Sequence, residues 1–377
     1  ACGFNSMGMM LSGGVGEQLA GWIAEGAPQV DLFSFDPARF HRATVADARW
    51  VLDRTHESYA KTYSIVFPGD ESLAGRGRRT STLHENLARR GCVFQARHGF
   101  ERPGWFAGVA AAAGAASTSA SAAPPLSTLP KPYDYYGAYA EEGSSWRLGK
   151  GRTHVPQHAK HLYDELIQGE CTFGWPASFD AVREEVRAAR EGVAFFDTSS
   201  FGKFSLTGPR ADDAMQWLCA ADLEGKGAGT VTYTPLCNAR GGVEADLTVT
   251  KTGENAWYLV TGGATATHDH RWMLHALEAG GFSHGDVRLI DKSDDITLLS
   301  VQGPASLRLL APLAQGALDS LGDFGFSTSK MVTFCNIPGV RMLRLTFVGE
   351  LGFELHVPAA RAAEAYETLR AAGDALE

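Results

Sequence analysis

The sequence predicts a multidomain α+β protein, and three observations carry that prediction. The chain has 377 residues, and domains of about 150 residues favour two or three of them over one. A segment of Ala, Ser, Thr, Gly and Pro, residues 107–131, separates an arginine- and aromatic-rich first part from the rest. From Cys171 onward, strand patterns alternate with helical patterns, which is typical of an α+β domain.

Composition and charge exclude several classes of protein. Hydrophobic residues make up 44% and charged residues 20%, which is ordinary globular usage and excludes wholesale disorder. The net charge is −9 with no basic stripe, so a nucleic-acid partner is not expected. No apolar run approaches the roughly 20 residues that a membrane span needs. The 6 cysteines are scattered without a CxxC pair, which argues against a disulfide scaffold and a metal site.

The first residues predict a glycine-rich turn that leads into a helix over Glu17–Glu25. Such a turn presents backbone N–H groups that suit an anion or an electron-rich ring edge, although close helix packing would explain the glycines equally well. The chain begins at Ala1 with no basic leader, and we interpret it as a fragment whose beginning is missing. It contains no GxGxxG fingerprint, so it has no dinucleotide phosphate loop of its own.

The segments that follow differ in character. Residues 27–106 form a mixed region, with a helix expected over Asp47–Tyr59. Residues 107–131 offer no packing face and are expected to be a flexible insertion, followed by a tyrosine-rich connector over 132–170. Within 171–377, strands are expected at Gly202–Leu206, Val231–Leu236, Val243–Thr250, Trp257–Thr261, Thr297–Gln302, Met342–Val348 and Phe353–Val357. Helices are expected at Asp180–Glu191, Ala211–Ala221, Thr267–Ala279, Ala305–Ala311 and Ala359–Ala372.

The strand after Arg240-Gly241-Gly242 is the strongest candidate for chemistry. Strand alternation places Ala245, Leu247 and Val249 on an apolar face and Glu244, Asp246 and Thr248 on a polar one. A solvent-exposed polar face is the alternative to a functional one. Tyr233 lies one strand away in a predicted hairpin, where it could approach Asp246 or pack in the core.

A second candidate is Glu350, in the glycine-flanked turn Gly349-Glu350-Leu351-Gly352. A carboxylate held in such a turn could accept two parallel N–H bonds from a heterocycle, or could be an exposed turn acid. His268-Asp269-His270 is not a convincing metal site, because residues i and i+2 do not face each other on a helix.

Seven strings, read in order, resemble a known family. They are GFNSMGMMLSGGVG, HESYAKTYSIVFP, GCVFQARHGFERPGWF, DTSSFGKF, GGVEADLTV, SVQGPAS and FVGELGFELHVP. Together they resemble the sarcosine and dimethylglycine dehydrogenases, flavoenzymes fused to a folate-binding domain similar to the glycine-cleavage T-protein. HESYAK and HGFERPGWF are most similar to the sarcosine branch of the family.

The resemblance implies a domain order. Residues 1–26 would be the end of an FAD-binding α/β domain, 27–106 a bridging middle domain, and 171–377 an aminomethyltransferase-like folate-binding α+β domain truncated at its C-terminus. It also implies that Gly8, Gly13, Gly14 and Gly16 approach the flavin ring, and that Tyr233 and Glu350 contact folate. The T-protein has two adjacent acids where this chain has Ala245-Asp246, which leaves Asp246 as the expected catalytic residue.

The activity implied by the resemblance is oxidative demethylation of sarcosine to glycine by an FAD enzyme, with the one-carbon unit passed to tetrahydrofolate. An electron acceptor such as electron-transfer flavoprotein and a mitochondrial matrix location are implied as well. The alternatives are a dimethylglycine dehydrogenase, a T-protein-like aminomethyltransferase and a non-catalytic folate-binding module. The flavin-turn string at the start of the chain argues against the last two.

Overall fold

A computed structural model describes the chain except residues 27, 63–64, 73, 98, 108–167, 319, 323 and 377. The predicted flexible insertion over 107–131 and most of the predicted connector over 132–170 therefore lie outside the described residues. None of the described helices is long and apolar enough to cross a membrane.

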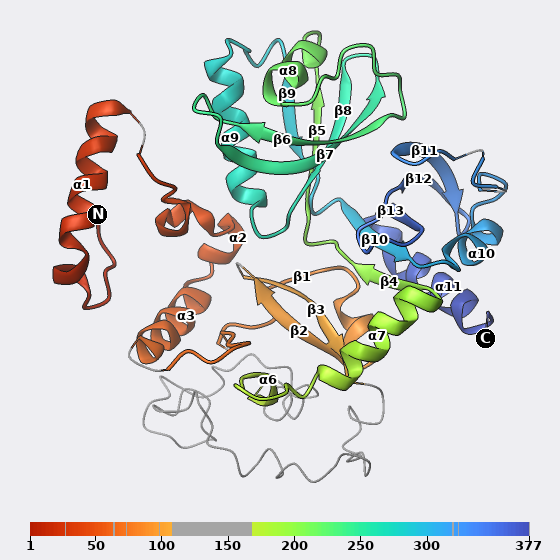
Figure 1. The fold of residues 1–377 in the computed structure, drawn as a ribbon, viewed down its shortest axis with the longest axis horizontal. Helices are drawn as coiled ribbons and strands as arrows, with labels where there is room; N and C mark the ends of the chain where they lie inside the picture. The colour runs from red at the N-terminus through yellow and green to blue at the C-terminus, as the bar shows by residue number, and fades with distance from the viewer. Residues whose placement is uncertain are drawn as a thin grey trace.

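Three sheets organise the described residues (Figure 1). A small sheet has strand order β1-β3-β2, and two five-stranded sheets have orders β6-β7-β8-β5-β9 and β11-β12-β13-β10-β4. Two antiparallel five-stranded sheets and one small mixed sheet, with helices packed beside them, confirm the predicted α+β fold class.

The N-terminal residues form helix α1 (Gly8–Glu25), which has no buried residue and stands apart from the sheets in Figure 1. The glycine-rich turn was expected to extend to Gly16, and this expectation was wrong: the helix starts at Gly8. Positive φ angles occur before the helix, as at Asn5, and after it at Gly26, but not within it. The glycines inside α1 can therefore adopt helical angles without strain, and the Met, Leu and Ala residues between them favour a helix. Short helices follow at Phe33–Phe35 (η1), Pro37–Arg39 (η2), Arg42–Val45 (α2) and Ala48–Lys61 (α3).

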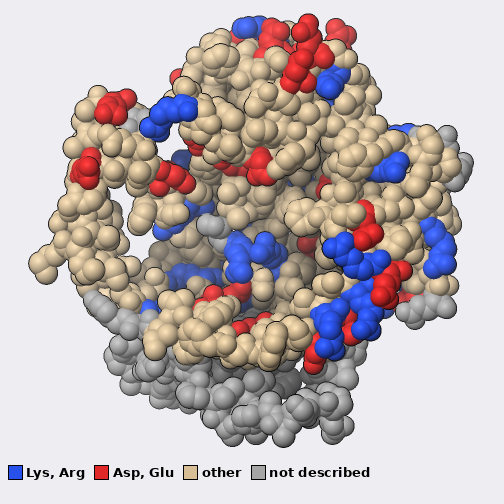
Figure 2. Space-filling view, in the orientation of Figure 1, with Lys and Arg blue, Asp and Glu red and all other residues tan. Residues whose placement is uncertain are grey.

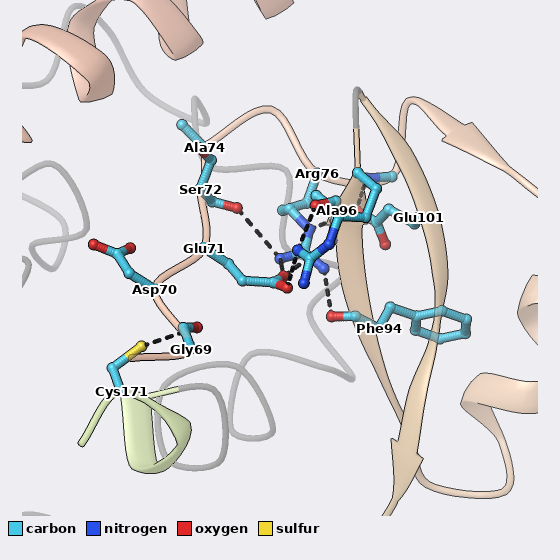
Figure 3. A network of polar contacts seen from close by, with 12 residues as sticks. Gly69, Asp70, Glu71, Ser72, Ala74, Arg76, Phe94, Ala96, Glu101 and Cys171 are labelled. Atoms are coloured by element: carbon cyan, nitrogen blue, oxygen red, sulfur yellow. Dashed lines mark hydrogen bonds and ion pairs between the residues drawn. The ribbon is translucent and has the colours of Figure 1, made fainter. Parts of the chain in front are cut away.

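The small sheet comprises β1 (Arg79–Thr80), β2 (Cys92–Arg97) and β3 (Phe100–Phe106), with α4 (His84–Ala88) between β1 and β2. Figure 3 shows the ionic network that ties this sheet to the preceding loop. Arg76, fully buried, donates through Nε to Glu101 Oε1 at 2.7 Å and through Nη2 to the Phe94 carbonyl at 2.7 Å. Burial alone would raise the pKa of Glu101, but hydrogen bonds from His84 and Arg76 outweigh it and lower this pKa to about 2.

The first five-stranded sheet packs against helices α8 (Ala211–Leu218) and α9 (Ala266–Ala279). Its core consists of side chains from one face of the sheet and from both helices, including Leu247, Leu259, Met215 and Met273. Its strands are β5 (Gly202–Thr207), β6 (Val231–Cys237), β7 (Val243–Gly253), β8 (Ala256–Thr261) and β9 (Arg288–Asp291).

The second five-stranded sheet shares one core with the small sheet, because Leu83 and Phe94 belong to the same buried cluster as Leu299 and Phe353. Its strands are β4 (Ala194–Asp197), β10 (Ile296–Gln302), β11 (Thr328–Phe334), β12 (Ile337–Arg344) and β13 (Gly352–Pro358). The remaining helices of this part are α6 (Gln168–Glu170), α7 (Phe179–Glu191), α10 (Ser306–Leu310), η6 (Ala311–Leu313), η7 (Ala359–Arg361) and α11 (Ala362–Asp374).

Strand prediction failed in two ways. The strand expected over Met342–Val348 ends at Arg344, because the side chain of Gln302 takes over the hydrogen bonding of Leu345 and Phe347 at 3.5 and 3.4 Å. Strands β4, β9 and β11 lie at sheet edges and were not predicted, and β4 and β9 have only four residues each. Neither is long enough for an alternating pattern to stand out in the sequence.

Candidate functional site at the β6–β7 hairpin

A tight turn builds the β6–β7 hairpin. The backbone N–H of Asn238 donates to the Gly242 carbonyl at 2.9 Å, and Asn238 Oδ1 accepts from the backbone N–H of Gly242 at 3.0 Å. Gly241 has a φ of +81°, which a residue with a side chain rarely adopts. The turn sets the strand register, in which Tyr233 lies opposite Thr248 and Pro235 opposite Asp246.

The hairpin brings Tyr233 and Asp246 into contact. The Tyr233 hydroxyl donates to Asp246 Oδ2 at 2.5 Å, and Tyr233 is 67% exposed. The hydrogen bond and the charge of the carboxylate raise the pKa of Tyr233, because both stabilise the protonated phenol. An exposed carboxylate with a hydroxyl donor beside it can bind an amine and can accept a proton.

Glu244 does not share the surroundings of Asp246, and the predicted common polar face was wrong at this residue. A bulge at Leu236/Cys237 leaves Glu244 without a partner on β6. Its carboxylate accepts from Asn238 Nδ2 at 2.7 Å and lies 3.7 Å from His268 Nε2 on α9. Because α9 packs on the apolar face of the sheet, the bulge has moved Glu244 away from the Asp246 face.

The face that carries Asp246 continues into the contact between the two large sheets. Thr248 pairs with Val260, and Thr250 pairs with Tyr258, so these residues share that face. The Tyr258 hydroxyl lies 2.9 Å from His356 Nδ1 on β13, which joins the sheets. Tyr258 and His356 are both buried, and burial lowers the pKa of His356.

Sequence reasoning missed Glu354 as a candidate. Its strand places Phe353 and Leu355 in the core, so Glu354 points to the opposite face together with His356, whose Nε2 lies 3.4 Å from Glu354 Oε2. The Glu354 side chain is 15% exposed, whereas that of Glu350 is 30% exposed. Alternation of apolar residues in FELHV was the signal that could have found it.

Glu350 lies in the loop before β13 and is paired with a cation. Glu350 Oε1 accepts from Arg190 Nη1 of α7 at 2.9 Å, and the same nitrogen donates to the Val348 carbonyl at 3.0 Å. No hydrogen bond or ion pair within the described ranges joins Glu350 to Asp246 or Tyr233. The structure therefore brings Asp246 and Tyr233 together and leaves Glu350 on another loop.

The predicted flavin glycines lie on α1. A side chain at Gly13, Gly14 or Gly16 would meet no atom within 4 Å, so the helix surface at these three positions is open, whereas one at Gly8 would contact Phe4 at 3.9 Å. Figure 2 shows that most of the α1 surface is uncharged. Met9 and Met10 are 94% and 85% exposed, which leaves an apolar surface beside the glycines.

Comparisons with known proteins match this architecture. A family model described as the GCVT N-terminal domain matches residues 83–377. The chain belongs to the GCVT N-terminal domain family. A model described as the FAD dependent oxidoreductase central domain matches residues 25–81. Across the described residues, no group of three or more His, Cys, Asp or Glu side chains is placed to hold a metal ion.

The relatives include dehydrogenases that are much longer than this chain. Human mitochondrial sarcosine dehydrogenase is 40% identical over 99% of this chain and 38% of its own length. Rat mitochondrial dimethylglycine dehydrogenase is 28% identical over 99% of this chain and 36% of its own length. The chain thus spans less than two fifths of these relatives. The family resemblance predicted from the motifs is confirmed.

Matches to aminomethyltransferases cover less of the sequence. The aminomethyltransferase of Symbiobacterium thermophilum is 36% identical over 53% of this chain. A crystal structure of the aminomethyltransferase T of the glycine cleavage system from Bartonella henselae has a TM-score of 0.51 at 20% identity. It covers 79% of this chain and 57% of its own, and it supports the fold alone.

Proposed function

We propose that this chain belongs to an FAD-dependent enzyme that demethylates sarcosine to glycine, and that its T-protein-like part passes the one-carbon unit to tetrahydrofolate. The 40% identity to human sarcosine dehydrogenase over 99% of the chain carries the proposal. The same comparison with rat dimethylglycine dehydrogenase gives 28% identity, which favours sarcosine as the substrate. The division into 1–26, 27–106 and 171–377 remains part of this proposal.

The residues of the β6–β7 hairpin fit a folate site. Tetrahydrofolate, when bound, supplies the amines that take up a one-carbon unit. Asp246 would accept a hydrogen bond or a proton from such an amine, because its carboxylate is exposed and lies on the face that leads between the sheets. Tyr233 would hold the carboxylate in place through its hydroxyl, and its exposed ring offers a surface for stacking.

The residues of α1 fit contact with a flavin but not its retention. FAD would supply the hydride acceptor for oxidation of the N-methyl group. Of the predicted flavin glycines, Gly13 and Gly16 are three residues apart on one side of the helix and would let it approach a flat ring, whereas Gly8 and Gly14 project in other directions. The pyrophosphate of a dinucleotide needs a glycine-rich loop, and no GxGxxG occurs among the 377 residues.

The partners and location follow from the same proposal. Electron-transfer flavoprotein, or a similar electron acceptor, would reoxidise the flavin of the whole enzyme. The human and mouse sarcosine dehydrogenases, each 40% identical to this chain, carry the word mitochondrial in their names. We propose a mitochondrial location, in the matrix.

Folate binding by the 377-residue chain tests the part of the proposal that the described residues carry. A calorimetric titration with 5-formyltetrahydrofolate should show binding, and Asp246→Asn should weaken it about tenfold or more, because a charge-assisted hydrogen bond is lost. Asp213→Asn on α8 is the control, because Asp213 is exposed and faces Arg210. Absence of folate binding by the unmodified chain, or equal loss in both variants, would overturn the assignment.

A further inference from the structure

A pocket of about 290 Å³ lies away from the β6–β7 hairpin, between the small sheet and the segment that runs from the loop after β9 into β10. The small-sheet side contributes Arg79 and Phe100, and the other side contributes Ser293, Asp294 and Thr297. Its volume is at the lower limit of the roughly 300–1,000 Å³ of pockets for drug-sized ligands. The pocket therefore suits a small molecule.

Two arginines line this pocket: Arg78 is paired with Asp47 at 3.0 Å, which leaves Arg79 as the cation available to a ligand. Its strand pairs with β3 so that Arg79 lies opposite Phe100, and the guanidinium carbon lies 5.1 Å from the centre of the Phe100 ring. Stacking on the ring orients the guanidinium without using its N–H donors. Among the described residues, no hydrogen bond or ion pair engages the Arg79 side chain, although it is half-buried.

Asp294 is the anion on the opposite wall. Its carboxylate, like the Arg79 guanidinium, has no hydrogen-bond or ion-pair partner within the described part of the chain. Burial lowers the pKa of Arg79, and the carboxylates of Asp294 and Asp291 oppose that effect. Arg79 and Asp294 thus interact across the pocket without forming an ion pair.

The two opposite charges restrict the ligand. A simple anion attracted by Arg79 would be repelled by Asp294. A simple cation attracted by Asp294 would be repelled by Arg79. A small α-amino acid carries a carboxylate and an ammonium on one carbon atom, so its carboxylate can pair with Arg79 while its ammonium pairs with Asp294. The guanidinium can hold the carboxylate with two parallel hydrogen bonds.

We infer that this pocket binds a small zwitterionic α-amino acid, of which glycine is the simplest, with Arg79 holding the carboxylate and Asp294 the ammonium. The inference goes beyond the proposed function, because it rests on the charges of the pocket and not on flavin or folate. A failure of the folate experiment would leave it untouched.

The first test needs no variant. Saturation-transfer NMR on the 377-residue chain would compare glycine, acetate and methylamine as probes. We expect a signal for the glycine methylene, with acetate and methylamine each binding at least about tenfold more weakly, because each lacks one of the two charges. No glycine binding at millimolar concentrations, or acetate binding as tightly as glycine, would overturn the inference.

Two variants then separate the charges. Arg79→Gln should weaken glycine and acetate alike by about tenfold or more, whereas Asp294→Asn should weaken glycine and leave acetate unchanged or tighter. Arg42→Gln and Asp295→Asn are the matched controls, since neither residue lines the pocket. Glycine binding that survives Arg79→Gln, or that falls equally in the controls, would place the ligand elsewhere.

Discussion

The Tyr233 hydroxyl lies 2.5 Å from Asp246 Oδ2, across two neighbouring strands of an exposed hairpin. The two residues are 13 positions apart in sequence, and the hairpin register brings them together. A short hydrogen bond between a phenol and a carboxylate fixes the orientation of the acid before a ligand arrives. The pKa of Tyr233 can therefore be measured without a ligand to test the hydrogen bond, whereas the role of Asp246 in catalysis needs the whole reaction.

The measurement without a ligand concerns the phenol. The Asp246 hydrogen bond and charge raise the pKa of Tyr233, so Asp246→Asn should return its titration to lower pH. NMR of the chain labelled with ¹³C-tyrosine follows this shift, with Tyr59 of α3 as the control residue. A Tyr233 titration that is the same in both proteins would show that the hydrogen bond does not form in solution.

The measurement on the reaction separates two half-reactions. In an enzyme that also carries the flavin-binding part, Asp246→Asn should slow methylenetetrahydrofolate formation about a hundred- to ten-thousandfold, the usual contribution of a positioned base. Flavin reduction by sarcosine should stay almost unchanged, because the proposed flavin contacts lie on α1. Rapid-mixing absorbance of the flavin, with folate products quantified separately, measures both. Folate capture at the normal rate would reduce Asp246 to a polar strand residue.

Glu350 gives a sharper test because its carboxylate is paired with Arg190 at 2.9 Å. If Glu350 holds the pterin, Glu350→Gln should weaken folate binding by about 1–3 kcal/mol, whereas Arg190→Gln should leave it nearly unchanged. Calorimetric titration of both variants and of Glu354→Gln compares the loop acid with the acid that faces between the sheets. Equal losses in Glu350→Gln and Arg190→Gln would mean that the ion pair only shapes the loop.

Glu101 predicts acid sensitivity of the small sheet. Burial opposes its ionisation, yet hydrogen bonds from His84 and Arg76 lower its pKa to about 2 from the usual 4.5. Because the folded pKa is depressed, the stabilisation is present above pH 4.5 and is lost as the pH falls toward 2, for a total of about 3 kcal/mol. Urea unfolding between pH 6 and 3 measures it, and Glu101→Gln should remove most of the slope.

The matched control for that experiment is Glu85→Gln, because Glu85 is exposed on α4. Glu101→Gln itself should destabilise the chain at pH 7 by about 3 kcal/mol, because the buried Arg76 loses its nearer carboxylate and keeps only Glu71 at 3.9 Å. An unchanged pH slope in Glu101→Gln would contradict the assignment.

Lys203 predicts a pH dependence of the same sign as that of Glu101, but at alkaline pH. Its side chain is fully buried, donates to the Ser199 carbonyl at 2.7 Å, and has a pKa lowered by burial to about 8. Because the folded pKa lies below the unfolded one, this group adds stability as the pH rises from about 8 to 10.5, by about 3 kcal/mol. Lys203→Met should therefore be more stable than the wild type at pH 7, and the advantage should shrink over that range.

The difference in unfolding free energy between Lys203→Met and the wild type, followed with pH, isolates this group from other titrating residues. Lys226→Met, at an exposed position, is the control. A destabilised Lys203→Met protein at pH 7 would show that the hydrogen bond to Ser199 outweighs the cost of burying the charge.

The sequence by itself determined the α+β class, most strands of the two large sheets, and the family. The strands follow from the alternation of apolar and polar residues, and the family follows from long sequence motifs. Both can be recognised in short stretches of the sequence. The proximity of Tyr233 to Asp246 was also within reach, because a tight turn between two alternating strands dictates which residues oppose each other.

Only the tertiary structure decided which residues share surroundings. The bulge at Leu236/Cys237 sends Glu244 to α9, and the pairing of Arg190 with Glu350 joins residues 160 positions apart. Leu83 shares a core with Phe353, which joins the small sheet to the second five-stranded sheet. Arg79 and Asp294 line the same pocket, although no sequence motif contains both. Contacts between distant segments depend on packing and register, and neither leaves a periodic signal in the sequence.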